Sequence, residues 1–412
     1  MKKFYLESYG CKLNESDSEI LKSILKKEYE ETSEKEADFI VLNTCGVIDR
    51  TEEKILRKTK DLQLLGKKVF WAGCLPLISR KNIADGSIGP SNLDDILLAV
   101  KREEHITSRK NMEKPLLCKS RRKDSGTAIV AISEGCPGNC SYCGSKLARG
   151  YLHSFSKESI LKEINEVLEA GFKEILLTSQ GLASYNLEKG SLMLPELVSD
   201  ILKIKKDFRL RLGMMNPNFA LKIIDDLIPL FKDDRLYNFL HLPIQSGSDK
   251  LLKEMNRGYS KEDFLNIVEK FRSLKGDTVL ATDIIVGHPK EDEEDFQETI
   301  ELVKRVKPEV LHIFRYSKRK GTADALLEEL DSRIKKQRSR ELTKIYKEYN
   351  LKENKKFLGR KVSVLVVRKE KDSYLSRMDS GRAVVLNEGS IGERITVQIT
   401  DCRWNYLVGS FI

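Results

Sequence analysis

The stretch Ser133-Glu-Gly-Cys-Pro-Gly-Asn-Cys-Ser-Tyr-Cys-Gly144 places three cysteines, Cys136, Cys140 and Cys143, on one short loop. Iron-sulfur cubanes are normally held by four cysteines, so a cluster on this loop keeps one iron free for another ligand. The alternative is a structural zinc site with His153 or another cysteine as fourth ligand. Such zinc sites usually combine two close-spaced pairs of ligands, which this loop lacks. The spacing therefore favours an iron-sulfur cluster with one open position.

Three further cysteines, Cys11, Cys45 and Cys74, each follow a short strand-like run. The runs cover residues 4–10, 38–44 and 68–73, with helical patterns over 15–27 and 51–64. This alternation predicts βα units of an open parallel α/β sheet, whose strands end at one common edge where ligands bind. A single free cysteine is often a small buried filler. Three at equivalent positions favour a second three-thiolate metal site.

The chain after residue 126 alternates strand and helix with regularity. Strand-like runs cover 127–133, 172–178, 208–214, 239–244, 278–286 and 310–316. A helix is predicted over 157–169, with Ser156 as N-cap and Gly171 as stop signal. Six βα units are too few for a closed eight-unit barrel and predict a partial (β/α)6 barrel. The loop with Cys136 follows the first strand and so lies at the carboxyl-end face, where such barrels carry their chemistry.

The last 60 residues differ in character, with short alternating strands and glycine-containing turns at 359–367, 381–386, 393–399 and 405–409. This pattern predicts a small all-β barrel. We therefore expect a multi-domain α/β protein. Its predicted parts are an N-terminal domain at 1–105, a basic linker at 106–126, a central barrel domain at 127–350 and a C-terminal barrel at 351–412.

Composition indicates a folded protein of a reducing compartment. The chain has 412 residues, of which 40% are hydrophobic, and no run long enough to span a membrane. Its opening residues are too polar for a secretory signal. Eight cysteines in so long a chain do not form a disulfide framework. We expect a cytoplasmic protein with no membrane partner.

The net charge of +10 is unevenly distributed. Residues 101–123 carry nine Lys and Arg against three Glu, and residues 331–412 carry nineteen against ten Asp and Glu. Basic segments beside a slightly acidic remainder are typical of proteins that bind a polyanion. Because lysine-rich surfaces are also often merely solvated, charge alone leaves nucleic-acid binding open.

Taken together, the segments resemble one family, the methylthiotransferases, which are radical S-adenosylmethionine enzymes. The resemblance rests on Ser8-Tyr-Gly-Cys-Lys-Leu-Asn-Glu, Leu42-Asn-Thr-Cys-Gly-Val, Ala72-Gly-Cys-Leu-Pro and the loop from Gly135 to Gly150, and it covers essentially the whole chain. The C-terminal segment is similar to the family's TRAM domain, an RNA-binding β-barrel. The resemblance therefore implies a radical SAM barrel flanked by a cluster-binding N-terminal domain and an RNA-binding domain.

Three other segments are similar to the archaeal and eukaryotic branch: Arg211-Leu-Gly-Met-Met-Asn-Pro, Phe239-Leu-His-Leu-Pro-Ile-Gln and Thr282-Asp-Ile-Ile-Val-Gly. That branch adds a methylthio group to carbon 2 of N6-threonylcarbamoyladenosine at position 37 of tRNA. The alternatives are the same chemistry on another tRNA adenosine or on a ribosomal protein. An alternative of a different class is a non-catalytic, zinc-containing RNA-binding protein.

The resemblance also implies roles for the cysteines. Cys136, Cys140 and Cys143 would be catalytic, holding the radical-generating cluster with S-adenosyl-L-methionine. Cys11, Cys45 and Cys74 would hold an auxiliary cluster that presents the sulfur. The implied cofactors are thus two 4Fe-4S clusters and S-adenosyl-L-methionine. The implied partners are tRNA, an electron donor and a sulfur or cluster donor.

Four residues are predicted to contact S-adenosyl-L-methionine. Tyr142 occupies the aromatic position beside the third cluster cysteine, and Gln180, Arg211 and Asn216 follow the second and third barrel strands. A core tyrosine and ordinary turn residues are the alternatives for these positions. The segment Gly181-Leu-Ala183 departs from the family's usual Asp-Thr-Gly and lacks its carboxylate.

Overall fold

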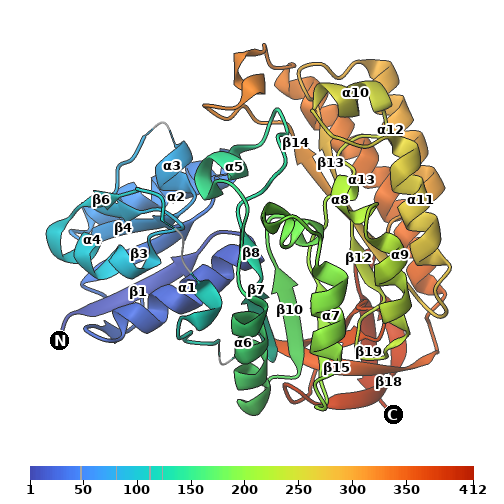
Figure 1. Ribbon diagram of the computed structural model, residues 1–412, viewed down its shortest axis with the longest axis horizontal. Helices are drawn as coiled ribbons and strands as arrows, with labels where there is room; N and C mark the ends of the chain where they lie inside the picture. The colour runs from blue at the N-terminus through green and yellow to red at the C-terminus, as the bar shows by residue number, and fades with distance from the viewer. Residues whose placement is uncertain (47–48, 80, 111–112, 123) are drawn as a thin grey trace.

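The computed structural model describes residues 1–46, 49–79, 81–110, 113–122 and 124–412. Figure 1 shows an N-terminal sheet on the left, an open barrel on the right and a small β-barrel below it. This arrangement confirms the predicted three-part α/β organisation.

The N-terminal sheet contains six parallel strands in the order β2-β1-β3-β4-β5-β6. Their bounds are β1 Lys3–Ser8, β2 Glu30–Glu31, β3 Phe39–Thr44, β4 Lys68–Gly73, β5 Gly86–Ile88 and β6 His105–Ile106. The three longest strands, β1, β3 and β4, are neighbours, and a cysteine follows each. The sheet therefore brings the loops of Cys11, Cys45 and Cys74 to one edge.

Helices cover both faces of this sheet. They are α1 Lys12–Leu25, α2 Asp49–Leu64, α3 Leu75–Ile78 and α4 Ile96–Arg102, with the short turn η1 Leu93–Asp95. On one face α1 and α4 bury Ile20, Leu21 and Ile96 against Phe4 and Val41. On the other face α2 packs against the sheet in a second core. Two separate cores, one on each side, explain why β3 is buried along its whole length.

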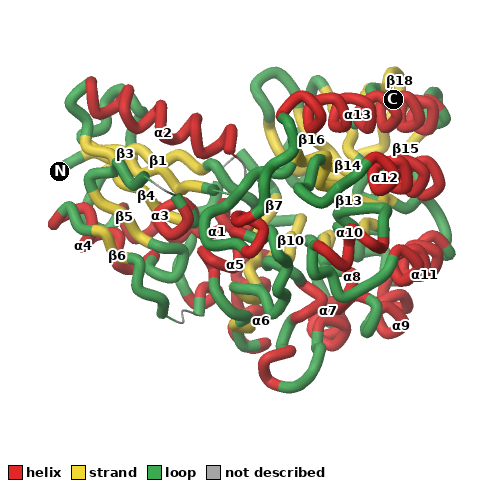
Figure 2. Tube along the Cα trace, turned by 90° about the horizontal axis from the view of Figure 1, so that it is seen from above, coloured by secondary structure: helices red, strands yellow, loops and turns green. Residues whose placement is uncertain are grey.

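The central barrel is built from six parallel strands. They are β7 Thr127–Ala131, β10 Glu174–Thr178, β11 Arg209–Leu212, β12 Phe239–His241, β13 Val279–Val286 and β14 Val310–Arg315. They form two three-stranded sheets, β11-β10-β7 and β12-β13-β14, which isolated bridges at Leu210–Leu236 and Met214–His241 connect. The order β7-β10-β11-β12-β13-β14 is that of the predicted partial barrel. Figure 2 looks down on this barrel.

Helices surround the barrel strands. They are α5 Gly144–Arg149, α6 Lys157–Glu169, α7 Leu194–Leu202, α8 Pro217–Ala220, α9 Ile224–Leu227, α10 Asp249–Glu254, α11 Lys261–Arg272, α12 Glu293–Val306 and α13 Ser332–Lys355. Short turns are η2 Lys114–Leu116, η3 Leu182–Ser184, η4 Leu187–Lys189, η5 Ile228–Lys232 and η6 Ala323–Leu326, and β8 Ser133–Glu134 pairs with β9 His153–Ser154. The predicted helix over 157–169 is confirmed, with Ser156 Oγ accepting a hydrogen bond from Ser159 N.

The two faces of the barrel strands differ chemically. Ile284 and Leu311 belong to the main hydrophobic core, which they share with residues of the outer helices α12 and α13. Side chains alternate along a strand, so Asp283 and His312 face the opposite, inner side. These two residues are register partners on β13 and β14. Polar groups are thus concentrated on the inner face.

The C-terminal barrel closes in the order β15-β16-β17-β19-β18. Its strands are β15 Lys361–Lys369, β16 Tyr374–Met378, β17 Ala383–Leu386, β18 Arg394–Cys402 and β19 Leu407–Phe411. It joins the central barrel through charged contacts: Arg377 with Glu174, Arg209 with Asp379 and Arg382 with Asp277. Because Glu174 and Arg209 begin β10 and β11, the small barrel lies at the amino-terminal end of the strands, away from the cysteine loops.

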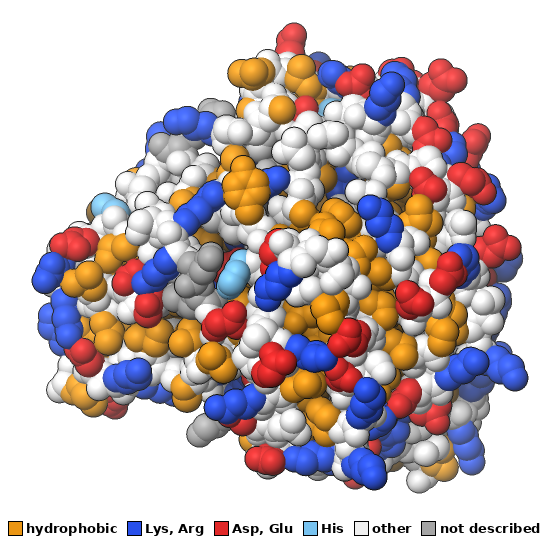
Figure 3. Space-filling model, viewed as in Figure 1, with side chains coloured by type: hydrophobic (Ala, Val, Ile, Leu, Met, Phe, Trp, Pro, Cys, Tyr) orange, Lys and Arg blue, Asp and Glu red, His pale blue; other side chains and the backbone are white. Residues whose placement is uncertain are grey.

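Charge is unevenly spread over the surface. On the face shown in Figure 3, Asp and Glu are frequent at the upper right, over α10 and α12, and Lys and Arg are frequent along the lower edge. Within the described ranges, no helix combines the length and the apolar character needed to cross a membrane.

Candidate functional site

The loop between β8 and α5 carries Cys136, Cys140 and Cys143 at the carboxyl-end face of the barrel. Its backbone turns back toward the sulfurs, because Gly138 N donates to Cys136 Sγ at 3.3 Å. A Cβ added at Gly138 would lie 3.3 Å from Cys136 Sγ and 4.0 Å from Cys140 Sγ. Glycine therefore keeps the space between these two sulfurs open. Lys146 donates to Gly138 O at 2.6 Å and fixes the turn.

A partly buried arginine approaches the middle cysteine of this loop. Arg257 Nη1 lies 3.0 Å from Cys140 Sγ, and Arg257 Nε donates to the Tyr259 hydroxyl at 2.8 Å. Burial raises the pKa values of Cys136 and Cys143 above the ordinary range of a thiol. Hydrogen-bond donors are thus directed at two of the three sulfurs, the Gly138 amide at Cys136 and Arg257 at Cys140.

The far side of the loop is anchored by Asp324 from η6. Ser141 Oγ donates to Asp324 Oδ2 at 2.7 Å, and His288 Nε2 lies 2.9 Å from the same oxygen. His288 is fully buried, and burial lowers its pKa although the Asp324 carboxylate raises it. The loop is thus tied to both β13 and β14 through the segments that follow them.

The second cysteine set lies at the edge of the N-terminal sheet. Cys11 precedes α1, Cys45 follows β3 and Cys74 precedes α3. Burial raises the pKa of Cys74 to about 12, and the nearby charges of Cys11 and Cys45 contribute to that rise. The positive charge of Arg149, at the end of α5, opposes this rise. The fold therefore assembles the three sulfurs that the sequence placed in separate segments.

The helices that follow Cys74 and Cys143 pack against one another. Cys74 and Ile78 around α3 pack with Ala148 of α5, and Leu77 and Leu147 border this cluster. Since α3 follows Cys74 and α5 follows Cys143, the segments of the two cysteine sets share one small apolar interface.

Neither set has the spacing of a preformed zinc site. Zinc-bound thiolates lie about 2.3 Å from the metal, hence roughly 4 Å from one another. Among the described residues, no three cysteine sulfurs all lie within 4.8 Å of one another.

Two of the four predicted S-adenosylmethionine contacts lie beside the cluster loop. Tyr142 is within the loop, and its pKa is raised by burial, while the charge of Arg257 opposes the rise. Asn216 caps α8 by accepting from Asn218 N at 3.1 Å, and its Nδ2 lies 3.8 Å from the position of a Cβ on Gly138. Asn216 thus combines a capping role with a place at the loop.

The other two, Gln180 and Arg211, each carry a buried polar atom. Gln180 Oε1 and Arg211 Nε are buried and have no hydrogen-bond partner among the described residues. Burial and the charge of Arg377 lower the pKa of Arg211 to about 9, and its guanidinium lies 4.1 Å from the centre of the Phe239 ring. Arg377 and Glu174 lie toward the amino-terminal end of the strands, so Arg211 is directed toward the floor of the barrel.

The segment Gly181-Leu-Ala183 packs against the core only in part. Leu182 and Ala183 are fully buried in the main hydrophobic core. Ser184 Oγ closes the turn by donating to Gly181 O at 2.8 Å. The family's aspartate corresponds to Gly181, where an added Cβ would meet only Ser184 Oγ at 3.8 Å, so packing does not explain the lost carboxylate.

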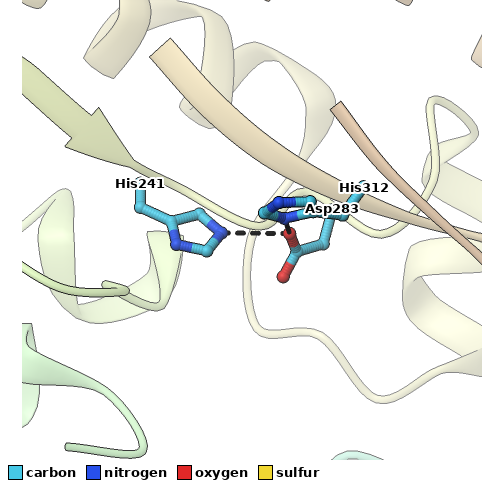
Figure 4. Close-up of side chains that lie close together, drawn as sticks. All are labelled: His241, Asp283 and His312. Atoms are coloured by element: carbon cyan, nitrogen blue, oxygen red, sulfur yellow. Dashed lines mark hydrogen bonds and ion pairs between the residues drawn. The ribbon is translucent and has the colours of Figure 1, made fainter. Parts of the chain in front are cut away.

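Three residues on the inner face form a further polar cluster, shown in Figure 4. His241 Nε2 and His312 Nδ1 lie 3.0 and 2.8 Å from the same Asp283 oxygen. Burial alone would raise the pKa of Asp283, but the two imidazoles outweigh it and hold that pKa well below its ordinary value. His312 is about half exposed, with 48% of its side chain accessible. The cluster is therefore open to a ligand inside the barrel.

Sequence reasoning did not single out Arg149, Arg257 or the cluster of His241, Asp283 and His312. For the cluster a signal existed, since each residue lies in one of three consecutive predicted strands. For Arg257 there was none, because it is 117 residues from Cys140.

Comparison with known proteins identifies the family. Residues 130–303 match the model of the Radical SAM superfamily, and residues 3–89 match that of Uncharacterized protein family UPF0004. A probable threonylcarbamoyladenosine tRNA methylthiotransferase of Archaeoglobus fulgidus is 44% identical, over 98% of this chain and 97% of that protein. A protein of the same description from Methanocaldococcus jannaschii is 38% identical over 99% of this chain and 96% of that protein. A tRNA-2-methylthio-N(6)-dimethylallyladenosine synthase of Clostridium tetani is 34% identical over 96% of this chain and 93% of that protein.

Solved structures support the same fold at low sequence identity. The radical S-adenosylmethionine methyltransferase TsrM of Kitasatospora setae aligns with a TM-score of 0.55 and 12% identity, over 79% of this chain and 74% of that one. The cobalamin-dependent S-adenosylmethionine radical enzyme OxsB aligns with a TM-score of 0.52 and 14% identity, over 79% of this chain and 55% of that one. Since its relatives are matched over nearly their whole length, the chain belongs to the methylthiotransferase family of the radical S-adenosylmethionine superfamily.

Proposed function

We propose that this protein transfers a methylthio group to carbon 2 of N6-threonylcarbamoyladenosine at position 37 of tRNA. The observation that carries the proposal is the apposition of the two cysteine sets through α3 and α5, on a chain similar throughout to threonylcarbamoyladenosine tRNA methylthiotransferases. One set would serve radical formation and the other sulfur transfer.

Radical SAM proteins hold one 4Fe-4S cluster and S-adenosyl-L-methionine. We assign Cys136, Cys140 and Cys143 to that cluster, with Arg257 and the Gly138 amide directed at its sulfurs. When bound, these cofactors supply a radical able to remove an unactivated hydrogen, which acid-base side chains cannot do. Tyr142, Gln180 and Asn216 remain the proposed contacts to S-adenosyl-L-methionine. Arg211 is not kept as a contact, because it is directed toward the floor of the barrel.

We assign Cys11, Cys45 and Cys74 to a second, auxiliary 4Fe-4S cluster. In this assignment all six cysteines of the two sets serve as cluster ligands, so none of them would supply the transferred sulfur. Each turnover therefore requires a separate sulfur or cluster donor and an electron donor.

The tRNA would be held in part by a row of cations on α13. Arg333, Lys336, Arg340, Lys344 and Lys347 recur every three or four residues and are all exposed. The opposite face of α13 is fixed to the protein by Tyr346, Asn350 and Asn354, the last two bonding to carbonyls near the C-terminal barrel. A fixed row of cations suits a phosphate backbone, and the small barrel would extend this surface.

The inner-face cluster of His241, Asp283 and His312 would contact the target nucleoside. The threonylcarbamoyl substituent carries a carboxylate, and each imidazole retains one ring nitrogen that is not directed at Asp283. These ring nitrogens can form hydrogen bonds with polar groups of the nucleoside.

Incubation with modified tRNA tests the proposal. The reduced, reconstituted enzyme would be given tRNA carrying N6-threonylcarbamoyladenosine or, in parallel, dimethylallyladenosine. Digested nucleosides would be examined by mass spectrometry for a methylthio group in place of hydrogen. We expect the product from the first tRNA. Product only from the second, or only on a ribosomal protein, would refute the assignment of the substrate.

A further inference from the structure

A closed ring of four buried charges joins the N-terminal sheet to the barrel. Lys114 Nζ lies 2.7 Å from Asp17 and 2.9 Å from Glu134, and Arg149 lies 2.8 Å from Asp17 and 2.7 Å from Glu134. All four side chains are buried, Lys114 and Asp17 completely. Each cation thus contacts both carboxylates, and each carboxylate contacts both cations.

Stability alone does not explain such a ring. Removing four charges from water is costly, and well-packed apolar residues are often as stabilising. A ring of this kind does, however, allow only one arrangement of its members, since displacement of any one leaves a buried charge unpaired. Its physical effect is to fix the relative position of the segments that carry it.

Those segments lead directly to the two cysteine sets. Asp17 lies on α1, which begins immediately after Cys11, and Glu134 ends β8, two residues before Cys136. Arg149 is the last residue of α5, which begins immediately after Cys143. Lys114, in η2, adds the segment between the sheet and the barrel.

Arg149 also lies beside the N-terminal cysteine set. Its positive charge acts on the Cys74 thiol and by itself lowers the pKa of that group, while the preceding residue, Ala148, packs on Cys74 and Ile78. The end of α5 thus borders Cys74 of the N-terminal sheet and, through Arg149, binds the carboxylates of Asp17 and Glu134.

We propose that Arg149 is a positioning residue for the auxiliary cluster. It holds Cys74 in place and makes binding of that cluster depend on the docking of the N-terminal sheet against the barrel. The inference rests on the proposed assignment of Cys11, Cys45 and Cys74 to that cluster. Its consequence is that the barrel, and not only the sheet, determines whether the sulfur-bearing site is complete.

The same interface offers a matched control. Arg121 lies 2.8 Å from Glu19 on α1 and 2.5 Å from Glu163 on α6, and Glu163 also pairs with Lys119 at 2.5 Å. These pairs are likewise largely buried and connect α1 to the barrel. Arg121 has no described contact with a cysteine. Replacing it disturbs the docking charges without touching the thiols.

The test uses the full chain with Cys136, Cys140 and Cys143 replaced by alanine, so that only the N-terminal set can bind a cluster. Arg149→Met, Arg149→Lys and Arg121→Met are added singly. After anaerobic reconstitution, iron and sulfide per chain and the electron paramagnetic resonance spectrum are measured, with circular dichroism as a check of folding. The parent should hold about four irons.

We expect Arg121→Met to keep most of this iron and Arg149→Met to keep less than half. Arg149→Lys keeps the charge but cannot reach Cys74 and both carboxylates, so it should also lose iron and should alter the spectrum of what remains. Should Arg149→Met fail to fold, the lysine variant decides. Iron content and spectra equal to those of the parent in the folded Arg149 variants would overturn the inference. An iron-free parent would overturn the auxiliary site itself, and the inference with it.

Discussion

Neutralising the cation row of α13 should weaken tRNA binding by an amount that the structure allows us to calculate. The perturbation is the triple variant Lys336→Gln, Arg340→Gln and Lys344→Gln. These side chains are exposed and span eight residues, or about 12 Å of helix. Several phosphates of one RNA strand lie within such a distance.

Each lost phosphate contact lowers the slope of log affinity against log salt by about 0.7 to 0.9. Three contacts therefore lower it by about 2 to 3, and at roughly 0.1 M salt they weaken binding about one hundredfold to several hundredfold. The stability of the protein should hardly change, because exposed charge substitutions usually alter it by less than about 0.5 kcal/mol.

The assay is tRNA binding by fluorescence anisotropy across a salt series. The matched control neutralises Lys203, Lys250 and Lys270, whose Nζ atoms lie 2.7, 2.5 and 2.6 Å from Asp200, Asp292 and Asp225. These cations are already paired with carboxylates, so the control should leave the slope nearly unchanged. An unchanged slope in the α13 variant, or an equal loss in both variants, would refute the assignment of this surface to RNA.

Three further outcomes are expected. Reconstituted protein should hold about eight irons per chain. A variant in which Cys136, Cys140 and Cys143 are all replaced by alanine should keep about half of that iron. Complete loss of iron in this variant would argue against two sites. Burial keeps His288 neutral in the folded protein, whereas in the unfolded chain its imidazole takes up a proton near pH 6.5. The free energy of unfolding, measured with urea, should therefore fall as the pH drops below about 6.5. His288→Phe should flatten this dependence, and an identical pH profile would disprove the explanation. His312→Ala should lower kcat/KM for tRNA about tenfold, equivalent to about 1.4 kcal/mol, while RNA-independent cleavage of S-adenosyl-L-methionine persists. Equal loss of both activities would indicate that His312 acts on the cofactor and not on the tRNA.

The parts of the site that depend on local spacing could be predicted from the sequence. Cys136, Cys140 and Cys143 share one loop, and strands of a parallel sheet necessarily end at one edge, which brings Cys11, Cys45 and Cys74 together. The helix from Lys157 to Glu169 could also be predicted, because its N-cap residue lies next to it in the sequence.

Strand number was harder to predict. In the N-terminal sheet β2, β5 and β6 have only two or three residues each, too few for a periodic pattern. In the C-terminal barrel β16 was missed because Tyr374 and Leu375 are adjacent apolar residues, and only pairing with β15 and β17 makes this segment a strand.

Contacts between distant segments were outside the reach of sequence reasoning. Arg149 meets Asp17 across 132 residues, and Arg257 meets Cys140 across 117. An arginine in a charged sequence carries no sign of such a partner. The C-terminal barrel gives a similar lesson, since its contacts with Glu174 and Arg209 show that it also braces the central barrel. Deleting it would therefore disturb more than RNA binding.

The division of labour between the two cysteine sets is the central claim, and a paired measurement on Cys45→Ala and Cys140→Ala tests it most directly. Each reconstituted variant is supplied with reductant, S-adenosyl-L-methionine and tRNA, and 5'-deoxyadenosine and methylthiolated nucleoside are quantified in the same sample. We predict that Cys45→Ala still forms 5'-deoxyadenosine but no methylthiolated base, whereas Cys140→Ala forms neither. Equal loss of 5'-deoxyadenosine in both variants would contradict the account.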